Sequence, residues 1–421
     1  MSAASFFTRP MQMDGLGPPL RRLLLTLVML SVLAGCSTSI TRTPLEPELY
    51  FKARVPDYPD ARFFGDKPLP DHAFDVELWK QFRLDVLKRV AGPGQPLQAH
   101  LLLLSGGGAD GAFGAGVLNG WTAFGDRPEF EIVTGVSIGA LMAPFAFLGA
   151  DYDAPLRDMF LSRNGIDDII RLRVFEALTG ALAVGDSTPL AKLIEQYVDD
   201  PLLDAIAAEH RKGRRLFVGT TNLDARRPIV WNMGAIAASS SPNRLALFRD
   251  VLRASSAVPG LSQPVFINVE LDGRIYQEMH VDGGVMHSLF LAVPTVTEEM
   301  RLATFGDITP TMWIIQNNKL RASYGPAEAS LRGILSDTVS ELIRAQSRGD
   351  QARLYFIAER ERFNYRLAAV PRSFNMPGGD DFDPEYMRTL YAVGEDLARN
   401  GYPWRDAPSS LERLDIIDSD Q

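Results

Sequence analysis

Ser137 combines the residue type and the local sequence of a catalytic nucleophile. It stands at the centre of Gly135-Val136-Ser137-Ile138-Gly139, which matches the Gly-x-Ser-x-Gly pattern of a nucleophile elbow. The segment from Phe130 to Thr134 predicts a short strand before it, and a helix is expected after it, to about Leu148. A sharp turn between the two would present the hydroxyl at a helix N-terminus, where free N–H groups favour developing negative charge. The segment therefore predicts attack by the serine on an acyl ester.

A glycine-rich loop lies one predicted strand upstream of this serine. Gly106, Gly107 and Gly108 follow an apolar run, and Gly111 comes near the start of a predicted helix. The spacing also fits Gly-x-Gly-x-x-Gly, which dinucleotide-binding proteins use to hold a pyrophosphate. Such proteins need an acidic residue at the end of the second strand, where this chain has Thr134. The competing interpretation is an oxyanion hole built from the exposed N–H groups of the glycines.

A serine nucleophile needs a base, and Asp282 is the candidate. The residues from Tyr276 to Val281 predict a strand that ends at Asp282, and Gly283-Gly284 lets the chain turn away. A carboxylate that accepts a serine proton should lie in a dry setting that raises its pKa. The alternative is an ordinary Asp-Gly turn.

Histidine offers a second catalytic arrangement. A triad in the chain order Ser-Asp-His would consist of Ser137, Asp282 and His287. His280 is also close in sequence, but strand alternation places it on the same face as Asp282, and it is expected to be a packed or surface residue. The dyad and the triad both remain open from these residues alone.

The elements around these residues predict an α/β fold. His100 to Leu104 is a continuous apolar run, as in a strand buried on both faces. Strand, glycine loop, helix, strand, sharp turn and helix form a βαβα unit, whose strands should be parallel and whose two loops should share one carboxyl edge. Further strands are expected at residues 216–218, 229–231, 312–315 and 354–357, and a last helix after Asp383-Pro384.

Taken in order, these segments resemble the patatin-like phospholipases. The resemblance implies a three-layer α/β/α fold with a mostly parallel central sheet and a Ser-Asp dyad without cofactor or metal. By position, Ser137 would be the nucleophile and Asp282 the base, and N–H groups around Gly106, Gly107 and Gly108 would form the oxyanion hole. The substrates would be acyl esters of phospholipids, lysophospholipids or neutral lipids. The matching segments are 105–108 with Gly111, 116–118, 135–139, 254–259 and Asp282-Gly283-Gly284.

One position departs from the family pattern. Asp110 stands where the family usually has Arg or Lys. A carboxylate that points into an oxyanion site would oppose catalysis. Asp110 is therefore expected to turn outward and cap the helix that starts near Gly111. The alternative is a catalytically weakened, lipid-binding envelope lipoprotein.

The N-terminus resembles a bacterial lipoprotein signal. Arg21-Arg22 precede an apolar run from Leu23 to Leu33, and Cys36, the only cysteine, follows Leu33-Ala34-Gly35. The resemblance implies that residues 1–35 are removed and that Cys36 carries lipid. Ser37 after the cysteine implies the outer membrane of a bacterial cell envelope. A plain signal peptide and a signal anchor are the alternatives.

Composition sets the remaining expectations. The formal charge is −9 and the pI about 5.2, which argues against binding to a nucleic-acid backbone. No His or Cys cluster suits a metal. Beyond the signal, a tether with an N-terminal helix from Phe74 to Val90 is expected at residues 36–97, the hydrolase domain at 98–300, and an extension that completes it at 301–421. The oligomeric state cannot be predicted from these features.

Overall fold

In the computed structural model of the chain, the described residues are 42–67, 97–162, 171–172, 185–186, 188–292, 308–320, 326, 329–376 and 382–408. The expected signal segment, Cys36 and the expected helix from Phe74 to Val90 lie outside them. Among the described residues, no helix has both the length and the apolar character that crossing a bilayer requires.

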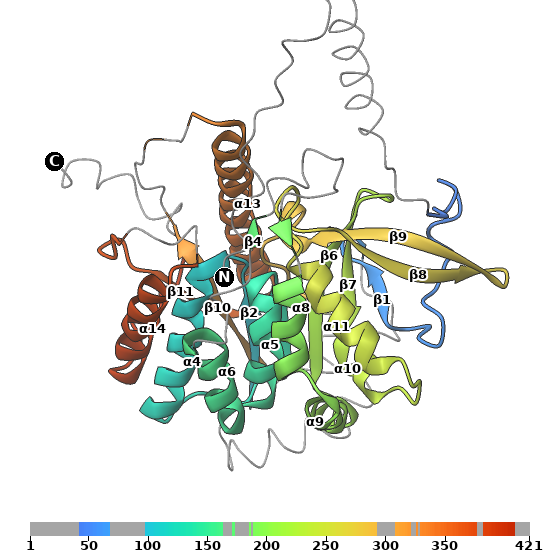
Figure 1. Ribbon diagram of the computed structural model, residues 1–421. Helices are drawn as coiled ribbons and strands as arrows, with labels where there is room; N and C mark the ends of the chain where they lie inside the picture. The colour runs from blue at the N-terminus through green and yellow to red at the C-terminus, as the bar shows by residue number, and fades with distance from the viewer. Residues whose placement is uncertain are drawn as a thin grey trace, which may run out of the picture.

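A nine-stranded sheet forms the centre of the described structure (Figure 1). Its order is β1-β7-β6-β3-β2-β10-β11, and β9 pairs with both β6 and β8. The run from β6 through β3, β2 and β10 to β11 is parallel. The strands are β1 (Arg62–Phe64), β2 (Leu97–Leu104), β3 (Ile132–Val136), β6 (Arg215–Asn222), β7 (Arg227–Asn232), β8 (Val265–Leu271), β9 (Arg274–Asp282), β10 (Ile308–Lys319) and β11 (Asn364–Val370); a separate pair consists of β4 (Arg171–Leu172) and β5 (Gly185–Asp186).

The apolar run of β2 shows why the sheet lies between two layers. Leu102 and Leu104 pack into one hydrophobic cluster, whereas Leu101 and Leu103 pack into another. Side chains alternate between the two faces of a strand, so each face of the sheet contributes to its own core. A strand buried on both sides accounts for the unbroken leucine sequence.

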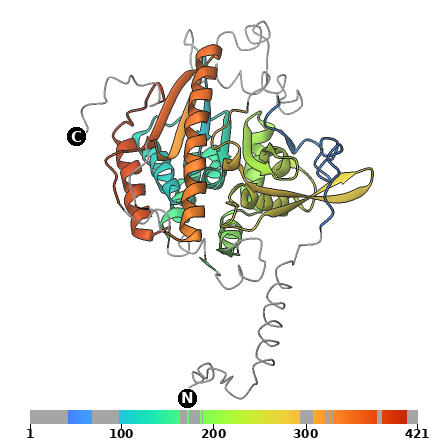
Figure 2. The ribbon, with the colours of Figure 1, turned by 90° about the horizontal axis from the view of Figure 1, so that it is seen from above.

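Helices cover both faces. The first cluster joins the sheet to most of the helices, whereas the second includes Leu354 and Ala358 of the long helix α13 (Figure 2). The expected three-layer α/β/α fold with a mostly parallel sheet is confirmed. The helices are α4 (Gly111–Phe124), α5 (Ile138–Leu148), α6 (Asp153–Leu161), α8 (Thr188–Tyr197), α9 (Asp200–Arg211), α10 (Met233–Ala238), α11 (Arg244–Ser255), α13 (Leu331–Glu361) and α14 (Pro384–Arg399), with single turns η3 (Gly108–Asp110), η4 (Ala150–Tyr152) and η6 (Gly283–Val285).

Two segments differ from the sequence-based expectation. The strand expected at 354–357 is wrong, because these residues lie within α13. Leu354 and Ala358 are buried there while Phe356 is 67% exposed, which is a helical spacing. Part of the expected tether belongs to the sheet, because Arg62–Phe64 pair with β7 and Tyr58 is buried.

The C-terminal residues contribute to the same sheet and its cover. β10 pairs with β2 and β11 pairs with β10. α14 packs so closely on α4 that a Cβ on Gly116 would lie 2.1 Å from the carbonyl oxygen of Tyr391. The predicted start of α14 is confirmed, since the Asp383 side chain accepts the N–H of Tyr386 at 2.8 Å.

Candidate active site

Ser137 lies in a strained turn between β3 and α5. Its φ and ψ are 55° and −126°, a positive φ that residues with a side chain rarely adopt. A Cβ on Gly139 would lie 2.4 Å from the carbonyl oxygen of Leu104, and one on Gly135 would lie 2.4 Å from the carbonyl oxygen of Gly139. The flanking glycines are therefore required by close backbone approach. Ser137 itself remains partly exposed.

Asp282 reaches the same point along a different strand. β3 ends beside β6, where Val136 pairs with Gly219. β9 approaches antiparallel along β6 and ends where Asp282 pairs with Thr220. Because β7 occupies the other side of these β6 residues, β3 and β9 meet end to end on one side. This register brings Asp282 next to Ser137.

The end of α11 and the residues after it connect the two strand ends. The Ser255 hydroxyl accepts the N–H of Ser137 at 3.0 Å and donates to the carbonyl oxygen of Gly219 at 2.7 Å. The N–H of Asp282 donates to the carbonyl oxygen of Ala257 at 2.9 Å. Sequence analysis gave Ser255 no role of its own, although it lies in one of the segments that resemble the family.

The Asp282 carboxyl is buried and only partly satisfied. It is 1% exposed. Its Oδ1 accepts the N–H of Gly284 at 2.7 Å, and its Oδ2 has no partner of good hydrogen-bond geometry in the described structure. Burial raises the pKa of Asp282 to about 6, while the nearby Ser137 hydroxyl and the Gly284 amide act in the opposite direction. Such a carboxylate is charged at neutral pH and more basic than an ordinary aspartate.

The glycine loop lies against the serine. A Cβ on Gly106 would lie 3.2 Å from the Cβ of Ser137. Among the described residues, no backbone hydrogen bond outside the helices and strands has the N–H of Gly106, Gly107 or Gly108 as its donor. A Cβ on Gly107 would lie 1.7 Å from the carbonyl oxygen of Asn317, so glycine is required there. Gly111 begins α4 directly behind this loop.

Two polar side chains that sequence analysis did not single out hold this loop. The Asn317 side-chain amide donates to the carbonyl oxygen of Ser105 at 2.7 Å, and its backbone N–H donates to the Ser105 hydroxyl at 2.8 Å. That hydroxyl donates to the carbonyl oxygen of Gly106 at 2.7 Å. The polar Gln316-Asn317-Asn318 at the end of an apolar strand was the available signal.

Asp110 is not the side-chain cap that the sequence predicts. It occupies the N-cap position of α4, but its side chain makes no capping hydrogen bond. Its Oδ1 instead accepts the hydroxyl of Tyr386 at 2.5 Å. The carboxylate is thus bonded to α14, and this partner accounts for an acidic residue at a position where the family usually has a basic one.

Residues 102–294 match the family model described as patatin-like phospholipase. This part of the chain is similar to the patatin-like phospholipases. Among solved structures, VipD from Legionella pneumophila is similar at 13% identity and a TM-score of 0.35, over 73% of this chain and 67% of that chain. The comparison with curated proteins returned no match.

The histidines near the candidate site have other partners. His280 is fully buried, and its ring nitrogens lie 3.0 Å from the Thr220 hydroxyl and 3.2 Å from Glu278. Burial lowers the pKa of His280, so the expectation of a packed histidine is confirmed. The Nδ1 of His287 lies 3.2 Å from Asp350.

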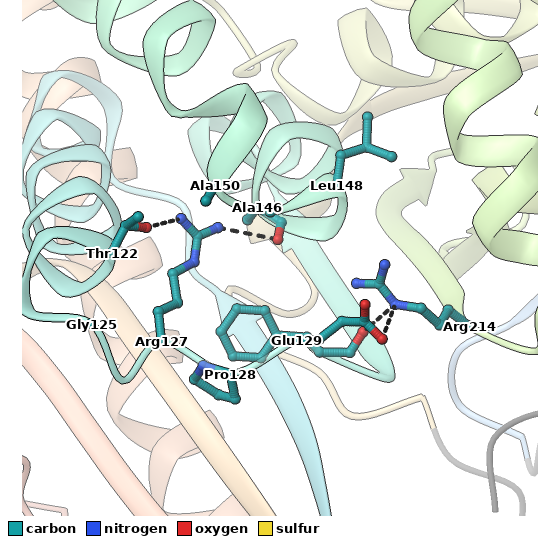
Figure 3. A pocket seen from close by; sticks show the side chains of 11 residues that line it. Thr122, Gly125, Arg127, Pro128, Glu129, Ala146, Leu148, Ala150 and Arg214 are labelled. Atoms are coloured by element: carbon teal, nitrogen blue, oxygen red, sulfur yellow. Dashed lines mark hydrogen bonds and ion pairs between the residues drawn. The ribbon is translucent and has the colours of Figure 1, made fainter. Parts of the chain in front are cut away.

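A cavity of about 340 Å³ lies at the opposite end of the central sheet. Arg127 and Arg214 line it near the starts of β3 and β6 (Figure 3). Arg127 donates to the carbonyl oxygen of Ala146, and Arg214 donates to that of Phe147. These guanidinium groups satisfy carbonyls at the C-terminal end of α5, where positive charge is favourable, so the cavity is a packing feature.

The described residues contain no group of three or more His, Cys, Asp or Glu side chains arranged to hold a metal ion. The candidate site at the carboxyl edge of the central sheet instead contains a hydroxyl, a carboxyl and backbone amides. These groups suit nucleophilic acyl chemistry.

Proposed function

We propose that the chain is a serine acyl-ester hydrolase that acts on lipid esters through a Ser137–Asp282 dyad. The observation that carries the proposal is the end-to-end meeting of β3 and β9 across β6. It places a strained, partly exposed serine beside a buried carboxyl. The match to the patatin-like phospholipases over residues 102–294 supports lipid acyl hydrolysis as the reaction class.

In the first step, the Ser137 hydroxyl gives its proton to Asp282 while its oxygen attacks the ester carbonyl carbon. The carbonyl π electrons move to the oxygen, and the oxyanion accepts hydrogen bonds from N–H groups of Gly106, Gly107 and Gly108. A preorganised donor of this kind typically contributes about 3–4 kcal/mol to the transition state. Collapse of the intermediate expels the alkoxide, which takes the proton from Asp282 and leaves an acyl-enzyme.

In the second step, a water molecule attacks the acyl-enzyme while Asp282 accepts its proton. The second tetrahedral intermediate releases the fatty acid, and the proton returns to the Ser137 oxygen. The raised pKa of Asp282, about 6, suits both transfers, because a base works best when its pKa lies near the operating pH.

An activity-based probe tests this proposal directly. A fluorophosphonate should label the pure protein at Ser137, and Ser137→Ala should abolish both the label and the turnover of p-nitrophenyl esters. Ser240→Ala changes an exposed serine and serves as the matched control, which should label like the wild type. An unlabelled wild-type protein, or undiminished labelling of Ser137→Ala, would contradict the proposal. Fatty-acid release from phospholipid, lysophospholipid and triacylglycerol then identifies the substrate class.

We further propose that Cys36 carries the lipid anchor and that the protein faces the bacterial outer membrane. The basic pair, the apolar run and the lone cysteine support this, and more than one acyl chain suffices for stable attachment. Metabolic labelling with an alkyne fatty acid should modify the wild type and not Cys36→Ser. Density fractionation should find the wild type with outer-membrane markers. A soluble or inner-membrane wild type would refute this location.

A further inference from the structure

The helix α13 lies beyond the residues that match the family, yet it contacts the candidate site. The match ends at residue 294, and α13 spans Leu331–Glu361. Its middle turns pack against the segment that follows Asp282. A Cβ on Gly284 would lie 3.6 Å from Ile343, so the helix lies close to the turn.

Asp350 binds this segment through two successive backbone amides. Its Oδ2 accepts the N–H of Ser288 at 2.7 Å and that of Leu289 at 3.1 Å. Asp350 is 1% exposed. A buried carboxylate is stabilised by several charge-assisted donors, and here two of them come from the chain that leaves the Asp282 turn.

Gln346 lies one helical turn before Asp350 and holds the same segment. Its side-chain amide donates to the carbonyl oxygen of Met286 at 2.8 Å. The segment folds back on itself as well, because the N–H groups of Met286 and His287 donate to the carbonyl oxygen of Gly283 at 3.0 and 2.9 Å. The chain from Gly283 to Leu289 is therefore fixed at both ends.

The charged groups around this contact belong to α13 and the bound segment. The Oδ1 of Asp350 lies 3.1 Å from Arg353 and 3.2 Å from the Nδ1 of His287. The described groups that act on the pKa of Asp282 are the Ser137 hydroxyl and the Gly284 amide, both uncharged. Asp350 is thus connected to Asp282 through the backbone between Asp282 and Ser288.

We propose that Asp350 and Gln346 are positioning residues that fix the Asp282-Gly283-Gly284 turn in its buried position. The proposal rests on the proposed function, in which Asp282 is the base. Loosening the segment moves the Asp282 carboxyl from its place beside Ser137 and admits water to it. Displacement of a reacting group by about 1 Å costs on the order of 100-fold in rate, and hydration of a carboxylate lowers its pKa toward the ordinary value.

The experiment compares Asp350→Asn and Gln346→Ala with Asp337→Asn, which makes the same chemical change at an exposed position of the same helix. The measurements are kcat/KM for a p-nitrophenyl ester from pH 4 to 9, fluorophosphonate labelling of Ser137, and thermal unfolding. Gln346→Ala changes no charge, so any movement of its acid limb comes from geometry. Asp350→Glu tests rescue by a carboxylate on a longer stem.

The kcat/KM of Asp350→Asn should fall about 100-fold. The acid limb of its pH profile should lie at lower pH than that of the wild type. The kcat/KM of Gln346→Ala should fall about 10-fold, and its acid limb should move in the same direction. This variant decides the question if Asp350→Asn does not fold. Asp350→Glu should recover part of the rate, and Asp337→Asn should match the wild type. Rates within threefold of wild type in both test variants, or losses with an unmoved acid limb, would overturn the proposal. A wild type without labelling or turnover instead refutes the proposed function.

Discussion

Two buried ionisable groups, one at each end of the central sheet, are hydrogen-bonded to different degrees. At the amino end, Arg214 is 2% exposed and uses all three guanidinium nitrogens, on the carbonyl oxygens of Phe130 and Phe147 and on Glu209. At the carboxyl end, Asp282 is equally buried, but one carboxyl oxygen lacks a well-formed hydrogen bond among the described residues. The amino end is built for stability, and the carboxyl end keeps a group whose desolvation is only partly compensated.

The incomplete hydrogen bonding of the Asp282 carboxyl bears on its reactivity. A buried, incompletely satisfied polar group costs on the order of 1–3 kcal/mol. The cost at Asp282 appears as a raised pKa, and a raised pKa is what a general base at neutral pH requires. Substitutions at the two ends should therefore move stability and activity in different directions.

Asp282→Asn gives the largest expected effect and tests the carboxyl end. The rate should fall by roughly 10³-fold, because the base is removed, while the folded state becomes more stable. An acid whose pKa rises from 3.8 to about 6 on folding destabilises the fold by about 3 kcal/mol above pH 6. Below pH 4 both states are protonated and this cost disappears.

Denaturant unfolding from pH 4 to 8 measures the stability part of this prediction. The stability gain of Asp282→Asn should be absent near pH 4 and grow as the pH passes through 4 to 6. A variant that is less stable than wild type at pH 8 would show that the Asp282 charge is not an uncompensated cost. Retention of full activity would remove Asp282 as the base.

Arg214→Met tests the amino end. Breaking a buried ion pair by removing one partner typically costs about 3–5 kcal/mol, and here two carbonyls and Glu209 also lose their donor. The unfolding midpoint should fall strongly, while kcat/KM of the folded enzyme well below that midpoint should stay within twofold of wild type. A fall in kcat/KM at full folding would mean that the two ends are coupled.

Asn317→Ala tests the glycine loop at the carboxyl end. The variant removes the amide that holds Ser105 beside the glycine loop, so the loop N–H groups should be less well aimed at the oxyanion. We expect kcat to fall about 10-fold, a share of the cost of losing an oxyanion-hole donor, with little change in KM. Asn400→Ala, at an exposed position, is the matched control. An unchanged kcat would show that the loop holds its geometry without Asn317.

Asp110→Asn should have the smallest effect. The Asp110 side chain is bonded to Tyr386, and an asparagine oxygen accepts the same hydroxyl. We expect kcat/KM within about twofold of wild type. A substitution of one polar side chain by another that keeps the same hydrogen bond usually has a small effect. A gain of tenfold or more would mean that the Asp110 charge opposes the oxyanion and that the enzyme is weakened at this position.

The sequence was most informative where the chemistry is local. The elbow at Ser137 and the glycine loop at Gly106–Gly108 each need close backbone approach within one strand-turn-helix unit, and glycine spacing records that need. The position of Asp282 followed from a strand end and a resemblance, but its contact with Ser137 depends on the antiparallel pairing of β9 with β6. Nothing in the local pattern of β9 specifies that partner.

The elements that the sequence analysis misjudged depend on long-range packing. Leu354-Tyr355-Phe356-Ile357 has the composition of a strand, and only its place within the 31-residue α13 decides for a helix. The contribution of Asn317 comes from a parallel partner, β2, far away in the chain. Tertiary contact overrides local propensity in such cases.

The meeting of β3 and β9 also determines where descendants of this chain can change length. The β8–β9 hairpin turns at Asp272-Gly273, both with positive φ, and extra residues there leave the pairing of Asp282 with Thr220 unchanged. One extra residue between His280 and Asp282 would shift the carboxyl by about 3.3 Å and turn it to the other face of the sheet. In related sequences, insertions should therefore be found at the tip of the β8–β9 hairpin and be absent from its base.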